Sequence, residues 1–554
     1  MKKILLKFSC LCLAMILLTA VISGCADNGQ KNDQGKNGTE ASSEPSKTGK
    51  PASEGTEKGE RVELTVEVYD RGTQCVHGIQ QGQTPVDNNY WTKWIQQEFG
   101  EPNNVDVKFV SCPRSEEVQM LNVWMAANQA PDISFTYSPN VVYNYYKNNG
   151  LTDLTDALEE YGSDLKQFLG EDVLSYGRFA DKQYALPAKR IMQAGTCTYI
   201  RKDWLDKLGL EIPDTTEDFY NVLKAFKEEN PGNVDKVVPY ALKALVRNDA
   251  RGFFEAFREE CSDKEYYINN RLFLPGYKEG ARFLNKMYNE GLMSPEFPID
   301  KDGTMLNQDV IRGAAGSYNG VYDFALRDVP GYCKNLAANV PGAELVPCDP
   351  YTNKYTGGHT KQINGPAGLY ILVPKSSEKK VNEVVKYLSW MSSKDVLFFL
   401  QYGNEGIGYT MVDGIPKVNQ VEGEQMFPSM QNLDYTLIVN GVDLGDPEKT
   451  IKANAMAYPG LEDLYRDCLK FALRDGYVVP TLPLQVDAEA KYTTNLEEKE
   501  EELYSKVITA KPEEFDSLWD SLTKEYLAAG GQEIIDQRTA AWEEMYGDSV
   551  DMPK

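Results

Sequence analysis

The sequence is poor in histidine and carries fewer basic than acidic residues. His77 and His359 are the only two histidines among 554 residues. This number nearly excludes a histidine-rich metal site and leaves few candidates for a Ser-His-Asp triad. Lysine and arginine number 58 against 83 acidic residues, which gives a formal net charge of -25. A surface this acidic repels phosphate backbones and anionic headgroups, which argues against nucleic-acid binding and peripheral membrane binding.

An apolar run opens the chain. Lysines at positions 2, 3 and 7 accompany the apolar residues 4–22, and Ser23 and Gly24 follow, which predicts a secretory signal over residues 1–24. A permanent membrane helix is the alternative, but it needs about 20 strongly apolar residues. Residues 22–25 (Ile-Ser-Gly-Cys) resemble the lipobox of bacterial lipoproteins, which implies that Cys25 becomes a lipid-modified N-terminus. Removal of the first 24 residues, with three lysines and no acid, changes the net charge to -28.

Large apolar side chains are missing from residues 26–60. This stretch holds no aromatic residue and no aliphatic residue larger than alanine. It therefore cannot bury enough surface to offset the entropy of ordering, and we predict a disordered linker over residues 25–60. As a flexible coil it spans roughly 30 to 35 Å, which suits a tether between a membrane and a folded body.

The cysteines do not form a metal or redox motif. None of the seven beyond residue 25 stands in a C-x-x-C pair, and their odd number leaves at least one free thiol. Cys75 follows the first predicted strand and Cys112 ends the second, so a disulfide between them is a hypothesis. We expect most of the others to be small buried hydrophobic residues.

The body of the chain alternates between strand and helix patterns. A strand at 62–69 is followed by a helix at 90–99, a strand at 105–110, a helix at 115–128 and a strand at 133–135, which predicts a parallel sheet covered by helices. Helices at 219–229, 277–290, 380–391 and 513–529 and short strands at 196–200, 314–318 and 369–373 follow. Because 494 residues after the linker are too many for one ordinary sheet, we predict an α/β fold with two lobes.

Seven short motifs carry a family resemblance. Residues 201–210 (RKDWLDKLGL) with 212–215 (IPDT) resemble the extracellular solute-binding proteins of ABC transporters, the family that includes the maltose-binding protein. The closest branch is the large Gram-positive lipoproteins of oligosaccharide and aldouronate type. The other matching stretches occur in the same order as in that family: 130–133 (APDI), 150–154 (GLTDL), 184–187 (YALP), 291–297 (GLMSPEF), 403–406 (GNEG) and 515–526 with Gly530-Gly531.

This resemblance implies a two-lobed periplasmic-binding-protein-like fold of type II, with a ligand cleft between hinged lobes. Three hinge crossings are expected near residues 193–199, 316–319 and 365–370. The N-lobe then comprises residues 61–193 and 318–366, and the C-lobe comprises residues 194–317 and 367–554 with the C-terminal helices. Ligands collect at strand carboxyl ends between such domains, and closure is a hinge motion that the ligand biases.

Candidate ligand contacts follow from the chemistry of sugars, which need aromatic platforms for ring faces and polar groups for hydroxyls. Each candidate also has a purely structural alternative, such as an Asp70–Arg71 pair that orders its loop or packing of the 405–409 loop. Tryptophans 94, 124, 204, 390, 519 and 542 sit in helical patterns typical of core, whereas Trp91 is ambiguous. The candidates lie at predicted strand ends, at crossings and in a glycine-containing loop: Tyr69, Asp70, Arg71, Tyr137, Arg190, Asn319, Tyr322, Glu405 and Tyr409.

A calcium site is not expected. Some members of the resembled family carry an acidic calcium loop after the helix that corresponds to residues 216–229. Here residues 230–239 (NPGNVDKVVP) replace most of those acids, with Val237 and Val238 where carboxylates should stand. We therefore expect neither a metal nor another cofactor.

The sequence thus indicates a monomeric, lipid-anchored receptor on the extracellular face of the membrane, held there only by its lipid. It captures an oligosaccharide, delivers it to the transmembrane subunits of an ABC permease and performs no chemistry. An exported two-carboxylate glycosidase, the same fold binding a peptide or polyamine, and an adhesive surface protein stay open as alternatives. The net charge of the chain does not attract an acidic sugar, so such a ligand requires local cations, and Arg71, Lys189 and Arg190 are available.

Overall fold

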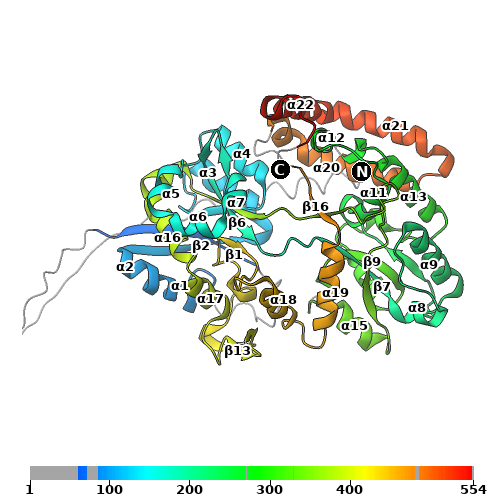
Figure 1. The fold of residues 1–554 in the computed structure, drawn as a ribbon, viewed down its shortest axis with the longest axis horizontal. Coiled ribbons are helices and arrows are strands. Elements are labelled where there is room, and N and C mark those ends of the chain that lie inside the picture. Colours follow the sequence, from blue (N-terminus) through cyan, green and yellow to red (C-terminus); the bar gives the residue numbers. More distant parts are fainter. Residues whose placement is uncertain (1–59, 72–84, 270, 329, 481–485, 552–554) are drawn as a thin grey trace, which may run out of the picture. The chain divides into compact units, whose positions relative to one another are not determined.

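The structure is a computed structural model that describes residues 60–71, 85–269, 271–328, 330–480 and 486–551. The chain divides into two units, residues 1–57 and 58–554, and the second unit holds every described helix and strand (Figure 1). The predicted signal segment, Cys25 with nearly all of the linker, and Cys75 of the proposed disulfide lie outside the described residues. No helix among the described residues has both the length and the apolar character needed to span a bilayer.

One sheet organises the first lobe. β1 (Val62–Asp70) pairs in parallel with β2 (Val105–Pro113) and, through Val66 and Ile133, lies parallel to the segment that enters β3 (Ser134–Thr136). β12 (Ala367–Leu372) runs antiparallel to both β3 and β6 (Ala185–Arg190), and β15 (Val439–Asn440) runs parallel to β6. β1 and β2 thus form a two-stranded sheet that the Val66–Ile133 bridge joins to the four-stranded sheet β3-β12-β6-β15. We call the two together the first sheet, and every strand in it except β12 ends at the same edge.

Helices cover this first sheet. Alternating apolar positions of β1 pack into a core with Trp91, Phe99, Leu388 and Leu400. Trp91 is fully buried and its indole Nε1 donates to the Met426 carbonyl at 2.9 Å, which assigns this ambiguous tryptophan to the core. The first-lobe helices are α1 (Tyr90–Ile95), α2 (Glu101–Asn103), α3 (Glu117–Ala127), α4 (Pro139–Lys147), α5 (Thr155–Tyr161), α6 (Ser163–Leu169), α7 (Glu171–Ser175), α16 (Val381–Met391) and α17 (Lys394–Tyr402).

A second sheet organises the second lobe, in the order β10-β7-β9-β8. β7 (Thr196–Arg201) is antiparallel to β10 (Leu345–Cys348) and β9 (Ala315–Val321), while β8 (Val238–Ala241) is parallel to β9. The carboxyl ends of β8, β9 and β10 and the start of β7 therefore share one edge. Side chains alternate between the two faces of this sheet, so Thr198 and Asn319 point to one face and Tyr199 and Tyr318 to the other.

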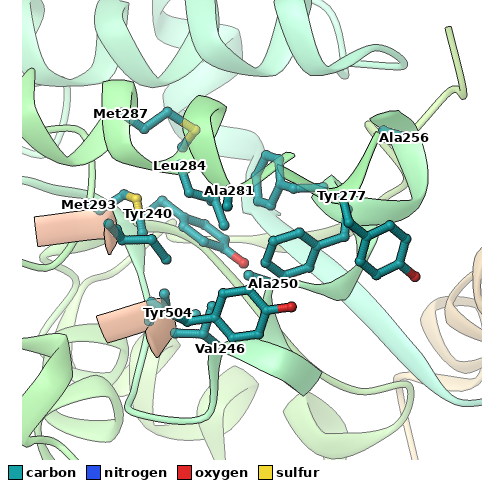
Figure 2. Close-up of a cluster of buried hydrophobic side chains, with 14 of the residues drawn as sticks. Tyr240, Val246, Ala250, Ala256, Tyr277, Ala281, Leu284, Met287, Met293 and Tyr504 are labelled. Carbon is teal, nitrogen blue, oxygen red and sulfur yellow. The ribbon is translucent and has the colours of Figure 1, made fainter. Parts of the chain in front are cut away.

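The core of the second lobe lies on the Thr198 face. Figure 2 shows side chains of this core, in which Tyr240 of β8 lies among Val246, Ala250, Ala281 and Leu284. Thr215 caps α9 (Thr216–Glu229), since its Oγ1 accepts from Asp218 N at 3.1 Å. The helices of this lobe are α8 (Lys202–Leu208), α9 (Thr216–Glu229), α10 (Val246–Asp249), α11 (Arg251–Phe257), α12 (Asp263–Ile268), α13 (Tyr277–Asn289), α14 (Thr304–Ile311), α15 (Tyr332–Asn339), α19 (Glu462–Leu473), α20 (Asp487–Thr509), α21 (Phe515–Tyr526) and α22 (Gln532–Tyr546).

The chain passes between the two sheets at positions that differ in part from the expected ones. The first passage covers residues 191–195 between β6 and β7, whereas the first crossing was expected near 193–199, a range that extends into β7. The expected crossing at 316–319 lies instead in the middle of β9, which is paired on both sides within the second sheet. The chain returns to the first lobe only between β10 and β12, over residues 349–366, and leaves it again after β15.

The lobe boundaries change accordingly. The segment 318–366, expected in the first lobe, contributes β10 to the second sheet, and β12 at the start of the segment 367–554 belongs to the first sheet. Gly316 lies in a crossing that was expected from the family resemblance, but in this structure its lack of a side chain serves packing. A Cβ there would lie 2.6 Å from Phe226 Cδ2 and 3.0 Å from Trp204 Cζ3, so the glycine marks the close approach of α8 and α9 to β9 rather than a hinge.

Smaller elements complete the fold. β11 (Lys361–Ile363), inside the second passage, pairs with β16 (Gly476–Val478), and β13 (Tyr409–Val412) forms a hairpin with β14 (Ile415–Val418). β4 (Arg178–Phe179) and β5 (Lys182–Gln183) form a short hairpin. α18 (Pro447–Ala455) follows the third passage and contacts α19.

Candidate functional site

The shared edge of the first sheet gathers aromatic and cationic side chains. Because five strands end there, residues that are far apart in sequence become neighbours. We call the following five residues the first-lobe cluster: Tyr69 and Arg71 at the end of β1, Arg114 after β2, Tyr137 after β3 and Arg190 at the end of β6. The sequence had singled out all of these except Arg114.

Arg114 is the centre of this cluster. Its guanidinium carbon lies 5.0 Å from the ring centroid of Tyr69 and 4.7 Å from that of Tyr137. Nη1 donates to Glu117 Oε2 at 2.6 Å, while Glu117 Oε1 accepts from Tyr137 N at 2.7 Å. Tyr137 OH in turn accepts from Asn440 Nδ2 of β15 at 3.0 Å. The buried Glu117 carboxylate thus holds Arg114 against two aromatic rings.

Burial differs between the two tyrosines. Tyr69 is only 2% exposed and burial raises its pKa, so its ring forms the buried part of the cluster. Tyr137 is half-buried, and burial raises its pKa against the opposing charge of Arg71. Tyr137 is therefore the aromatic ring of this cluster that retains an accessible surface.

Arg71 is already paired. Its Nε and Nη2 donate to the two carboxylate oxygens of Asp434, each at 2.7 Å. Burial opposes the charge of this guanidinium, but Asp434 outweighs it and holds the pKa of Arg71 above the ordinary value. Asp70, its neighbour, is exposed. Lys189, the other nearby cation, has Asp443 Oδ2 at 3.9 Å.

The second lobe contributes a polar cavity of about 150 Å³ at the edge of its sheet, which we call the hinge pocket. Its lining includes Thr198, Arg251, Asn319, Tyr351 and Gln362. Thr198 Oγ1 donates to Asn319 Oδ1 at 3.2 Å and lies 2.9 Å from Tyr351 OH. The pocket adjoins both the first passage, at Gly195, and the second, at residues 359–364.

The acids in the hinge pocket have partners of their own. Glu255 accepts from Arg258 Nε at 2.8 Å and also from Tyr277 OH. Asp349 is 3.0 Å from Lys361 Nζ, and burial raises the pKa of Asp349 while that lysine opposes the rise. The negative charge of each carboxylate is therefore offset by a neighbouring cation, which reduces its repulsion of an anionic ligand.

A larger cavity, of about 530 Å³, lies on the other face of the second sheet. Its lining comes from residues 326–328, 334, 456–459 and 461 of the second lobe and from residues 417–421, 427, 430 and 431. Tyr458 and Leu326 belong to the hydrophobic cluster on which Tyr199 and Tyr318 lie. Because Thr198 and Asn319 face the opposite way, this cavity is separate from the hinge pocket.

The remaining predicted contacts fall in different places. Asn319 lines the hinge pocket. Tyr322 points to the opposite face, where its ring lies 5.9 Å from that of Tyr465. Tyr409 packs edge-on against Phe398 of α17 at 5.3 Å, and Glu405 is exposed beside it. In the described part of the chain, none of Tyr322, Glu405 and Tyr409 lines the hinge pocket.

Two residues of the site went unnoticed in the sequence. Arg114 directly follows a predicted strand, as Arg71 does, and the same rule would have found it. Arg251 begins a short helix with no motif around it, so no sequence signal pointed to it. Arg251 Nη1 donates to Gln362 Oε1 at 2.6 Å and Nη2 to Asn248 Oδ1 at 2.7 Å.

No metal centre is found in the residues that the structure describes, where no three His, Cys, Asp or Glu side chains converge. The loop compared with the calcium loop closes on itself, since Asn230 Nδ2 donates to the Val234 carbonyl at 2.9 Å and its Oδ1 accepts from Val234 N at 3.1 Å. Cys112, from the disulfide hypothesis, is buried at the end of β2.

Comparisons with known proteins agree on one class. The family model described as bacterial extracellular solute-binding protein matches residues 82–397. The chain is 25% identical over 345 residues to lipoprotein LipO of Bacillus subtilis, covering 60% of this chain and 66% of LipO. It is 23% identical over 475 residues to the polygalacturonan/rhamnogalacturonan-binding protein YtcQ of the same organism, covering 81% of this chain and 87% of YtcQ.

A solved structure shows the same fold. The substrate-binding protein FusA of Streptococcus pneumoniae in complex with kestose superposes with a TM-score of 0.62 at 16% identity, covering 88% of this chain and 100% of FusA. The two-lobed α/β architecture predicted from the sequence is thereby confirmed.

Proposed function

The chain belongs to the family of bacterial extracellular solute-binding proteins, and on this premise we propose that it captures an oligosaccharide between its lobes and delivers it to the permease of an ABC importer. The hinge pocket carries this proposal. It lies where the chain passes between the two sheets and is lined by amide, hydroxyl, guanidinium and phenol groups. These groups match the hydroxyl rim of a sugar, and an aromatic such as Tyr137 suits its ring face.

The passages between the lobes support a hinged mode of capture. Three extended segments join the lobes, so a ligand that contacts both Tyr137 on the first and the hinge pocket on the second favours the closed arrangement. YtcQ is named for binding polygalacturonan and rhamnogalacturonan, and FusA for transport of fructooligosaccharides. Both names support a sugar as the cargo of this chain.

The relatives are named as binding proteins, and we propose that this chain likewise binds its ligand without altering it. We further propose that Cys25 carries the lipid that holds a monomeric receptor on the extracellular face of the membrane. The relative LipO is named as a lipoprotein, which supports this anchor. Replacement of Cys25 by serine should release the protein into the medium, and retention of the variant in the membrane would contradict the anchor.

The test of the function is a thermal-shift screen of the purified protein against neutral and acidic oligosaccharides, peptides and polyamines. A ligand that binds only the folded state stabilises it by about 2.7 kcal/mol at 100 times its dissociation constant. We expect a shift with one class of oligosaccharide, and mass spectrometry should recover that sugar uncleaved. If only a peptide or an amine raised the melting temperature, the cargo would be that class of solute rather than a sugar. If the sugar were recovered in a shortened form, the protein would be an enzyme.

A further inference from the structure

Two arginines at the site have no carboxylate oxygen within 4.0 Å among the residues that the structure describes. The structure describes all 16 arginines of the chain, and 13 of them have a carboxylate oxygen within 4.0 Å. The exceptions are Arg190, Arg251 and Arg271. Arg271 is half-buried, and although burial opposes its charge, Glu500 and neighbouring tyrosines together raise its pKa. Arg190 and Arg251 are the two that belong to the candidate site.

Arg190 is half-buried, and the carboxylates nearest to it in the first-lobe cluster, Asp434 and Glu117, are paired with Arg71 and Arg114 instead. Its Nε donates to the Ala367 carbonyl at 3.4 Å. Burial lowers its pKa, and the phenols of Tyr137 and Tyr370 are the groups that oppose this. The segment 72–84, which directly follows Arg71 and lies outside the described residues, contains no aspartate or glutamate, so it offers no carboxylate either.

Arg251 is in the same situation on the second lobe. Its donors end on the side chains of Gln362 and Asn248 and, at 3.4 Å, on the Arg247 carbonyl, all of which are neutral. Burial and the charge of Arg271 lower its pKa. Glu255, the acid that favours its charge, is held by Arg258 at 2.8 Å. An arginine guanidinium stays protonated in proteins, so Arg251 carries a charge to which no described carboxylate is directly bonded.

One stretch of chain connects the two arginines. Arg251 contacts Gln362, while Arg190 contacts Ala367 with its side chain and Pro366 with its backbone N at 2.8 Å. The six residues from 362 to 367 are joined by five Cα–Cα steps and span at most about 18 Å. Both guanidiniums therefore flank a single passage between the lobes, at a separation that one oligosaccharide can bridge.

We propose that the ligand is an acidic oligosaccharide and that Arg190 and Arg251 each pair with one of its carboxylates. This inference rests on the proposed function and narrows it to sugars that carry uronic-acid units. The guanidinium fork matches a carboxylate with two parallel hydrogen bonds. With a net charge of -25, the chain as a whole does not attract an anion, so recognition depends on these local cations.

The first experiment measures which sugars the protein retains from a mixture. The full chain is incubated with a mixed pool of oligogalacturonides, uronic-acid-decorated xylan fragments, alginate fragments, and neutral xylan, fructan and mannan fragments, and the retained sugars are identified by mass spectrometry. We expect retention of species with at least one carboxylate. Retention of neutral sugars alone would overturn this inference and leave the proposed function intact, whereas retention of no sugar would reject both.

The second experiment assigns the residues. The retained sugar and its methyl ester, which has the same rings without the charge, are compared by calorimetry. Arg190→Gln and Arg251→Gln should each weaken the acid at least tenfold and the ester less than threefold, because only the acid loses a charge-assisted pair. Arg190→Lys should recover part of the loss. Arg466→Gln, on the exposed face of α19 and paired with Asp463, is the control and should change neither affinity.

Equal losses for the acid and the ester would show that the arginines shape the pocket rather than read charge. A thermal scan of each variant without ligand shows whether it is folded. If the glutamine variants unfold, the comparison of acid with ester on the wild-type protein still decides the inference, since an ester that binds as well as the acid would overturn it.

Discussion

Arg71 and Asp434 are 363 positions apart in sequence and form a two-pronged salt bridge, with Nε and Nη2 each 2.7 Å from a carboxylate oxygen. The pair joins the end of β1 to the segment that leads into β15. The Asp434 side chain is 4% exposed and that of Arg71 is 23% exposed. If its partner is removed, the Arg71 guanidinium can therefore be hydrated more readily than the Asp434 carboxylate.

This asymmetry predicts unequal costs of truncation. Arg71→Ala leaves a buried carboxylate without its counter-charge and should lower the free energy of unfolding by about 3 kcal/mol. Asp434→Ala should cost less, because the guanidinium of Arg71 can turn toward solvent. Urea denaturation of both variants measures the difference, and a larger loss for Asp434→Ala would contradict the explanation.

A second prediction concerns Glu67, which is fully buried in β1. Its Oε2 accepts from Phe135 N at 3.0 Å. Burial raises the pKa of Glu67 to about 8, against the hydrogen bonds from Phe135 and Cys112. Since the folded pKa lies above the ordinary value, the folded state binds this proton more tightly, and the stability present below about pH 4.5 is lost as the pH rises toward 8.

The contribution of Glu67 to the free energy of unfolding should therefore fall by up to about 1.4 kcal/mol per pH unit between about pH 4.5 and 8. Glu67→Gln keeps an acceptor for Phe135 N and removes the titration, so the variant should lose this slope and exceed the wild type at pH 8. Denaturation curves over that pH range measure both. Parallel pH profiles for the two proteins would show that Glu67 does not titrate there.

The strand ends were readable from the sequence because alternation of apolar residues marks β1, and turn-forming segments bound it. Arg71 was found in this way, whereas Arg190 was chosen because it precedes the expected first crossing. Its lack of an acidic partner was not readable, because the pairing of Arg71 with Asp434 and of Arg114 with Glu117 depends on which strands become neighbours. The third passage after Asn440 was missed for the same reason, since β15 is only two residues long and joins β6 across 250 positions of sequence.

A substitution at Gly316, in the middle of β9, tests whether this glycine serves as a hinge or allows close packing. Ala at this position would place its Cβ 2.6 Å from Phe226 Cδ2 and 3.0 Å from the Pro239 carbonyl oxygen. Gly316→Ala should therefore cost about 1 to 3 kcal/mol of stability through overpacking. Gly365→Ala is the matched control in the second passage, where the nearest atom would be 3.7 Å away. Equal stability of the two variants, measured by urea denaturation, would contradict the packing explanation.

The last prediction tests whether Tyr137 serves as a platform for a sugar ring. Its ring lies on Arg114, and its hydroxyl accepts from Asn440 Nδ2 at 3.0 Å, so the ring and the hydroxyl have separable roles. Tyr137→Phe removes only the link to β15 and should leave affinity for the retained oligosaccharide within about threefold. Tyr137→Ala removes the apolar face and should weaken binding about tenfold, which corresponds to about 1.4 kcal/mol. Calorimetry measures the affinity of both variants. If Tyr137→Phe loses as much affinity as Tyr137→Ala, the hydroxyl rather than the ring determines binding. If neither variant loses affinity, the ligand does not contact the first-lobe cluster at this residue.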